Sequence, residues 1–112
     1  MIYNLDKLNE MADGDKDFIN SVISVFLEEV PQDLEQLETA LSQRNYENVY
    51  KLAHKIKPNV DLLGMEQTRQ AALDIETLGK SASGSSEIER IFPTLKQDIH
   101  QVISELKKDF DL

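Results

Sequence analysis

The apolar residues between positions 49 and 63 recur at spacings of three and four, which is the pattern of an amphipathic helix. Steps of about 100° per residue place them on a single stripe. Three further stretches repeat this pattern, and no stretch alternates apolar and polar residues between turn signals as a strand does. The chain is therefore expected to be built from helices. The first stripe consists of Val49, Leu52, Ala53, Ile56, Val60 and Leu63.

The other stripes span residues 18–41, 68–78 and 88–106. The first of these keeps its phase across Pro31, which predicts one kinked helix and not two separate ones. Pro93 is expected to kink or interrupt the last helix near its start. A short helix is predicted over residues 2 to about 12, with Leu5, Leu8 and Met11 on one side.

Local signals predict where the helices begin and end. Asp15 and Asn45 are suitable N-caps for the second and third helices, and Ser85 or Ser86 for the last one. Gly64 is expected to end the third helix. The small polar residues from Gly79 to Ser86 are interpreted as a loop. The acidic residues of the second helix are interpreted as its solvated face: Glu28, Glu29, Asp33, Glu35 and Glu38.

Length and composition fit one domain over residues 1–112. The prediction is an all-α fold, an antiparallel four-helix bundle with a short additional N-terminal helix. A net charge of −9 argues against nucleic acid and anionic membranes as partners. The chain has no cysteine, no long apolar run and no signal peptide, which fits a cytoplasmic protein. A monomer is the default expectation.

His54 lies about 160° from Ile56 around the third helix, nearly opposite the buried face. The imidazole is therefore expected in solvent. One interpretation is an ordinary surface histidine, and the other is a nucleophile presented on a rigid element. Three lysines surround it in an otherwise acidic chain and would attract a phosphoryl group. They are Lys51, Lys55 and Lys57.

The pairs Ala53-His54, Ile56-Lys57 and Leu63-Gly64 resemble the signature of histidine-containing phosphotransfer (HPt) domains. The ten-residue step from His54 to Gly64 fits that pattern, as do a Phe and a Pro about five residues apart in the second helix. One departure is plain, because Pro58 stands where the family has a small Gly. This change places the docking geometry of the helix in question.

The resemblance implies a phosphorelay intermediate. His54 would take a phosphoryl group from a receiver-domain phosphoaspartate and pass it to the aspartate of another receiver, with Lys57 offsetting charge. Glu76, 22 residues further on, would hold the other ring nitrogen, although spacing alone also fits a surface glutamate. The receiver would supply the metal ion, and this chain would need no cofactor or metal. Docking is expected to involve Tyr50, Lys51, Lys55, Pro58, Asp61 and Leu73.

The expected partners are response-regulator receiver domains and a hybrid sensor histidine kinase. The chain would be a phosphoryl carrier and not an enzyme, because it has no ATP-binding segment. The alternative is a helical adaptor that binds a signalling partner, with His54 vestigial. A di-metal bundle enzyme is disfavoured because neither His54 nor His100 follows a glutamate by three residues. The Gly79-Lys80-Ser81 triplet lacks the other features of a phosphate-binding loop.

Overall fold

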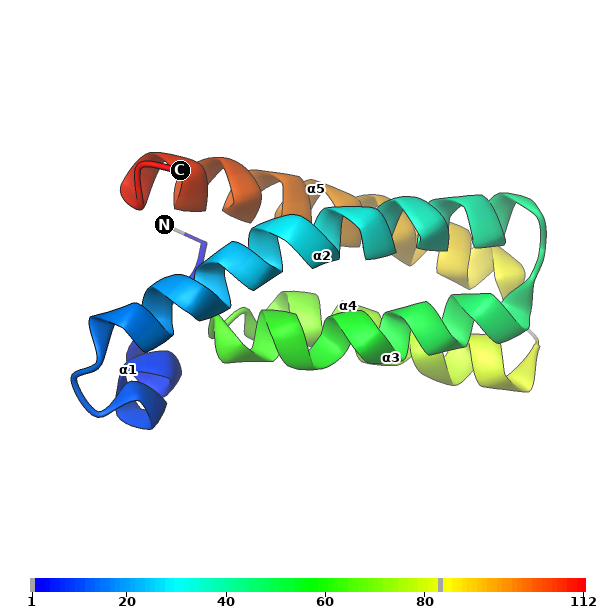
Figure 1. Ribbon diagram of the computed structural model, residues 1–112. Coiled ribbons are helices and arrows are strands. Elements are labelled where there is room, and N and C mark those ends of the chain that lie inside the picture. Colours follow the sequence, from blue (N-terminus) through cyan, green and yellow to red (C-terminus); the bar gives the residue numbers. More distant parts are fainter. Residues whose placement is uncertain (1, 83) are drawn as a thin grey trace.

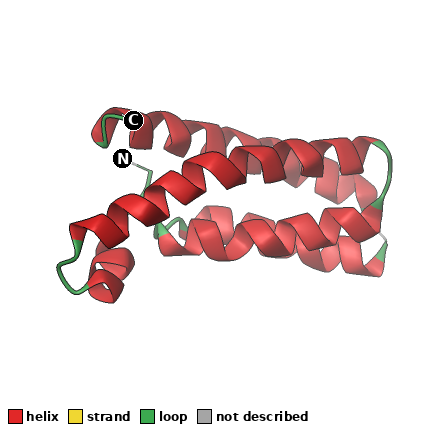
Figure 2. Ribbon diagram, in the orientation of Figure 1, coloured by secondary structure: helices red, strands yellow, loops and turns green. Residues whose placement is uncertain are grey.

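The computed structural model describes residues 2–82 and 84–112, and its helices form an antiparallel bundle (Figure 1). The long helices α2 to α5 make up the bundle, and α1 is a short additional helix, as predicted. No strand occurs in the described parts of the chain (Figure 2). None of the described helices combines the length and apolar content that crossing a bilayer requires. The helices are α1 Asp6–Ala12, α2 Lys16–Ser42, α3 Tyr46–Leu62, α4 Glu66–Ser81 and α5 Ser85–Asp109.

Neighbouring helices in the chain are also neighbours in space, and α5 closes the bundle by packing against both α4 and α2. The molecule is elongated, with extents of 44 × 22 × 20 Å. Helix α1 packs against α2 at one end of the bundle, and the residues before α1 lie beside the C-terminal part of α5 (Figure 1). Residues 2–5 precede α1 without being helical, which corrects the predicted start of the first helix. There the Asn4 backbone N–H donates to the Leu63 carbonyl at 2.7 Å, and the Tyr3 hydroxyl donates to Asp109 Oδ2 at 2.6 Å.

The core consists mainly of the predicted apolar stripes. Ile56 and Ile75 are fully buried where α3 and α4 face the interior. Two expected members lie outside the core, since Phe18 is 37% exposed and Met11 is 57% exposed. Both belong to the end of the bundle around α1, where fewer helices are present to cover them. The stripe pattern therefore predicts the core best where four helices meet.

The helix boundaries follow most of the predicted signals. The Asp15 side chain accepts from the backbone N–H groups of Asp17 and Phe18, and Asn45 accepts from that of Asn48. Helix α5 begins differently from the prediction, because its N-cap is Gly84, which makes no side-chain capping bond. Helices α2, α3 and α5 continue through their prolines, so Pro93 does not interrupt α5. Figure 1 shows α2 changing direction near its middle, where Pro31 lies.

The predicted loop from Gly79 to Ser86 is wrong over most of its length, and residue 83 lies outside the described residues. Helix α4 continues to Ser81, and Gly79 is buried within it. A Cβ atom at Gly79 would lie 3.0 Å from Tyr50 Cβ and 3.2 Å from the Tyr50 backbone nitrogen. Glycine therefore serves here to let α4 approach α3 closely, and it does not break the helix. The packing gained across this contact overrides the poor helix propensity of glycine.

The prediction that Asp33 belongs to the solvated face of α2 is wrong, because this residue is 3% exposed. Its Oδ1 accepts a hydrogen bond from Lys55 Nζ at 3.0 Å, while Oδ2 is buried without a partner among the described residues. A buried carboxylate is costly unless it is paired, so the cation of Lys55 offsets part of this cost. The ion pair between Asp33 and Lys55 joins α2 to α3. Lys55 is the residue that follows His54 in α3.

Candidate functional site

His54 lies in the middle of α3 with its imidazole directed outward, as predicted. Its side chain is 68% exposed, whereas the neighbouring Ala53 and Ile56 are fully buried. The buried neighbours hold the helix against the bundle, and the helix in turn fixes the position of the imidazole. The site therefore presents an accessible ring on a rigid support.

Glu76 reaches His54 from α4. Its Oε2 lies 2.9 Å from His54 Nδ1, and its Oε1 accepts a hydrogen bond from Lys57 Nζ at 2.9 Å. The Glu76 side chain is 7% exposed, so it is not an ordinary surface glutamate. One buried carboxylate thus joins the exposed imidazole to a half-buried lysine.

The charge state of Glu76 follows from its surroundings. Burial raises its pKa, but the hydrogen bonds and charges of Lys57 and His54 outweigh burial, so the pKa lies below its usual value of 4.5. Glu76 is therefore a carboxylate near neutral pH and can act only as an acceptor. A hydrogen bond between it and His54 requires the proton on Nδ1, which leaves the lone pair of a neutral ring on Nε2.

Lys80 is a member of this site that the sequence analysis did not identify. Its Nζ lies 3.6 Å from Glu76 Oε2 and 5.9 Å from the centroid of the Tyr50 ring. A hollow of about 290 Å³ beside the imidazole is lined by His54, Glu76, Lys80, Tyr50 and Lys51. The signal was present in the sequence, because Lys80 follows Glu76 by four residues, the spacing of neighbours on a helix. It was missed because residues 79–86 were assigned to a loop.

The three lysines named from the sequence have different surroundings. Lys57 is 25% exposed and is bonded to Glu76, whereas Lys51 is 58% exposed and bonded to Glu47 at 3.0 Å. Lys55 is directed toward α2, where it pairs with Asp33.

The hydrogen bonds and charges of Glu47 and Asp33 raise the pKa values of Lys51 and Lys55, so both remain cations. Lys51 is the one of the three that lines the hollow beside His54.

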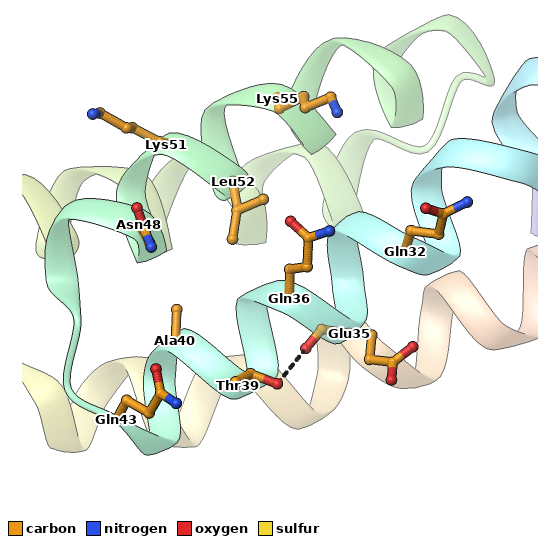
Figure 3. A pocket seen from close by; sticks show the side chains of 10 residues that line it. All are labelled: Gln32, Glu35, Gln36, Thr39, Ala40, Gln43, Asn48, Lys51, Leu52 and Lys55. Carbon is orange, nitrogen blue, oxygen red and sulfur yellow. Dashed lines mark hydrogen bonds between the residues drawn. The ribbon is translucent and has the colours of Figure 1, made fainter.

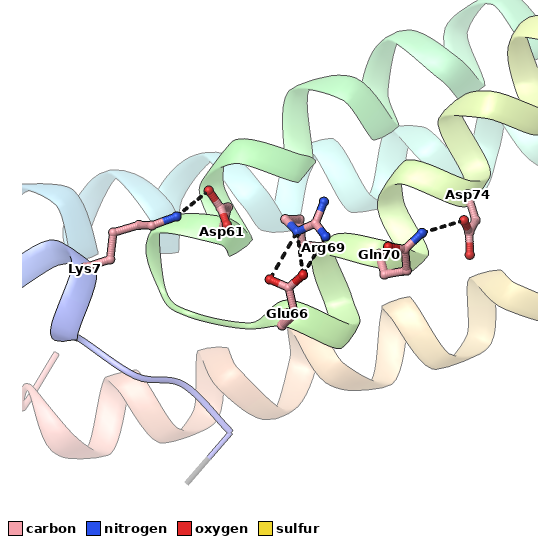
Figure 4. A network of polar contacts seen from close by, with 6 residues as sticks. All are labelled: Lys7, Asp61, Glu66, Arg69, Gln70 and Asp74. Carbon is pink, nitrogen blue, oxygen red and sulfur yellow. Dashed lines mark hydrogen bonds and ion pairs between the residues drawn. The ribbon is translucent and has the colours of Figure 1, made fainter.

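The remaining predicted docking residues are spread along α3 and α4. Pro58 is exposed, and Asp61 is paired with Lys7 of α1 at 2.9 Å (Figure 4). Leu73 is half-buried and lines a separate hollow between α4 and α5, so the structure does not bring it together with His54. Their role in docking stays a prediction.

A larger hollow lies elsewhere, between α2 and α3, and measures about 660 Å³ (Figure 3). Amide and hydroxyl side chains provide much of its lining, with Lys51 and Lys55 along the α3 side. His54 and Glu76 are absent from its lining. We therefore place the candidate site at the smaller hollow, where an accessible imidazole meets a buried carboxylate.

No group of three or more His, Asp or Glu side chains within residues 2–82 and 84–112 is arranged to hold a metal ion. The polar groups at the site instead form one connected set around the Glu76 carboxylate, which is hydrogen-bonded to His54 and Lys57 and forms a longer ion pair with Lys80. Such an arrangement can orient an imidazole and place positive charge beside it. It suits the handling of an anionic group at Nε2.

Comparisons with known proteins identify the family and the fold of the chain. The family model described as Hpt domain matches residues 21–105 of the chain, which include the whole site. The crystal structure of the HPT domain of an Hpt sensor hybrid histidine kinase from Shewanella, determined to 1.80 Å, matches with a TM-score of 0.85 and 20% identity. That match covers 98% of this chain and 94% of the other, and at this identity it shows a shared fold. No curated protein matched the chain. The chain belongs to the Hpt domain family.

Proposed function

We propose that this chain is a phosphorelay carrier in which His54 accepts a phosphoryl group from the phosphoaspartate of a receiver domain and passes it to the aspartate of a second receiver. Hpt domains are phosphotransfer modules of two-component signalling, and that family membership supports the general function. The observation that supports His54 as the carrier is the 2.9 Å contact between its Nδ1 and the buried carboxylate of Glu76, with the ring 68% exposed.

The transfer step balances with the groups present. The Nε2 lone pair forms a bond to phosphorus while the bond from phosphorus to the aspartyl oxygen breaks, and the aspartate leaves as a carboxylate. The proton on Nδ1 stays in place, so the phosphorylated ring carries a positive charge beside Glu76. Transfer onward reverses these changes on a second receiver. Little covalent chemistry is left to the carrier beyond orientation and charge stabilisation.

The partners under this proposal are receiver domains and a hybrid sensor histidine kinase. The receiver would supply the metal ion and the acidic pocket, so this chain would act as a substrate of the relay and not as an autonomous enzyme. An exposed imidazole suits this role because a receiver must bring its phosphoaspartate to within bonding distance of Nε2.

The test is transfer of labelled phosphate from charged receiver domains of the same organism to three versions of the protein. His54→Gln removes the proposed acceptor, and His100→Gln is the matched control, since His100 is the other histidine and lies exposed on α5. We expect an acid-labile label on the wild type and on His100→Gln, and none on His54→Gln.

Two results would contradict the proposal. Label on His54→Gln would place the acceptor elsewhere. No label on any version, with receivers shown to be competent and proteins shown to be folded, would favour the adaptor function. Binding of receivers to His54→Gln as tightly as to the wild type would then be the expected property of an adaptor.

A further inference from the structure

We propose that Lys80, and not Lys57, is the lysine that contacts the phosphoryl group on His54. This inference rests on the proposed carrier function. It names the residue of the same site that would contact the phosphoryl oxygens. Lys57 then has a different role, which is to fix the position and charge of Glu76. The two lysines differ in burial, in hydrogen bonding and in their access to the hollow beside the imidazole.

Lys57 is already hydrogen-bonded to Glu76. Its Nζ donates to Glu76 Oε1 at 2.9 Å, and its side chain is 25% exposed. Moving it to a phosphoryl group would leave Glu76 buried with its strongest partner removed, which is costly for a carboxylate in the interior. Lys57 also does not line the hollow beside His54.

Lys80 is available. Its contact with Glu76 Oε2 is 3.6 Å, longer than a hydrogen bond, and its side chain is 61% exposed. It lines the same hollow as His54, together with Tyr50. The Tyr50 ring, 5.9 Å from Nζ, favours a cation in this region without holding it in a fixed bond. A short movement of a flexible side chain can therefore bring the ammonium to a group on His54.

The backbone explains why Lys80 stands at this place. Gly79 brings α4 to within contact of Tyr50, one helical turn before His54 on α3. Any larger residue at position 79 would move this part of α4 outward. The side chain after Gly79 consequently begins close to the rim of the hollow, and it belongs to the same helix face as Glu76.

The charges around His54 after transfer also favour Lys80. After transfer, Glu76 faces the positively charged phosphorylated ring and Lys57, so its carboxylate no longer needs a third cation. The phosphoryl oxygens add negative charge at the exposed end of the ring, on the side of the hollow. Lys51 also lines the hollow, but its Nζ donates to Glu47 at 3.0 Å. Lys80 is the lysine at the hollow without a carboxylate at hydrogen-bond distance among the described residues.

The test compares two phosphoryl donors on Lys80→Met. Phosphoramidate transfers its phosphoryl group by breaking a P–N bond, and it needs no protein docking; a charged receiver domain needs both docking and transfer. Loss of one charge-assisted hydrogen bond at an exposed site corresponds to about a tenfold decrease in the rate of His54 labelling. We expect this decrease with both donors, and we expect Lys80→Arg to recover most of the rate.

Lys107→Met is the matched control, because Lys107 is an exposed lysine near the far end of α5, and it should label as the wild type does. Lys80→Gln serves as a second neutral variant, with circular dichroism to show that each variant is folded. Normal labelling of both neutral variants by phosphoramidate, whatever the receiver result, would overturn the assignment. A wild type that neither donor labels would instead refute the carrier function itself, and the assignment with it.

Discussion

Replacing Glu76 with glutamine keeps the shape of the side chain and removes its charge. The carboxylate is 7% exposed and joins His54 Nδ1 to Lys57 Nζ through two contacts of 2.9 Å. In Glu76→Gln one amide oxygen remains as an acceptor, while the amide NH2 replaces the second acceptor. One of the two contacts therefore loses its acceptor, and the half-buried ammonium of Lys57 loses its counter-charge.

The size of the effect follows from these contacts. A hydrogen bond to a charged group contributes roughly 1.5–3 kcal/mol, and the substitution removes one such bond while weakening the other. We expect the free energy of unfolding at pH 7 to fall by about 2 kcal/mol. Phosphoryl transfer should persist at a reduced rate, because the amide oxygen can still accept the Nδ1 proton of His54.

The loss of stability in Glu76→Gln should depend on pH. The pKa of Glu76 is lowered below 4.5 in the folded protein, so its charge stabilises the fold above the unfolded pKa. That contribution disappears as the pH falls through the lower folded pKa. The difference between wild type and Glu76→Gln is therefore expected to be complete at pH 7 and to shrink as the pH falls below about 4.5.

Urea denaturation followed by circular dichroism, at pH values from 7 to 3, measures this difference. Glu38→Gln is the matched control, because Glu38 is 50% exposed and pairs with Lys96 at 2.8 Å on the surface. The control should change stability by less than about 0.5 kcal/mol. A difference for Glu76→Gln that is absent at pH 7, or that stays constant down to pH 3, would refute the buried ion-pair explanation.

Three further substitutions test other parts of the structure by the same denaturation assay. Ile56→Ala should cost about 2–5 kcal/mol because Ile56 is fully buried, and a loss below about 1 kcal/mol would contradict its place in the core. Gly79→Ala should destabilise by about 1 kcal/mol, since the added Cβ meets Tyr50 at 3.0 Å. A gain in stability, the usual result for this change in a helix, would disprove the close approach. His54→Gln should change stability by less than about 0.5 kcal/mol because the ring is exposed, and a large loss would mean that His54 has a structural role.

The bundle could be predicted from the sequence because its main signal is local. Apolar spacing alone identified the buried faces of α2 to α5, and side-chain caps at Asp15 and Asn45 marked two helix starts. Gly79 was misinterpreted because its helical state depends on a contact with Tyr50, 29 residues earlier in the chain. Local propensity contains no information about such a contact, and it favoured a loop.

The same limit applied to the charged residues. Asp33 lies three residues after Val30 and four before Leu37, so its spacing placed it on the buried stripe, yet its charge favoured solvent. Lys55 offsets part of the cost of burying Asp33. It lies on another helix, so the spacing of residues within α2 cannot identify it. For Glu76, the 22-residue step from His54 gave the correct neighbour through the family resemblance, but its burial and its bond to Lys57 required the packed structure.

The most direct test of the central claim is NMR of the protein labelled with ¹⁵N at histidine, before and after charging by a receiver domain. Glu76 holds the proton on Nδ1, so we predict a ¹⁵N–³¹P coupling at Nε2 of His54 with Nδ1 still protonated. His100 should be unchanged. Phosphorus on Nδ1, phosphorus on His100, or a charged protein without any histidine–phosphorus coupling would contradict this account.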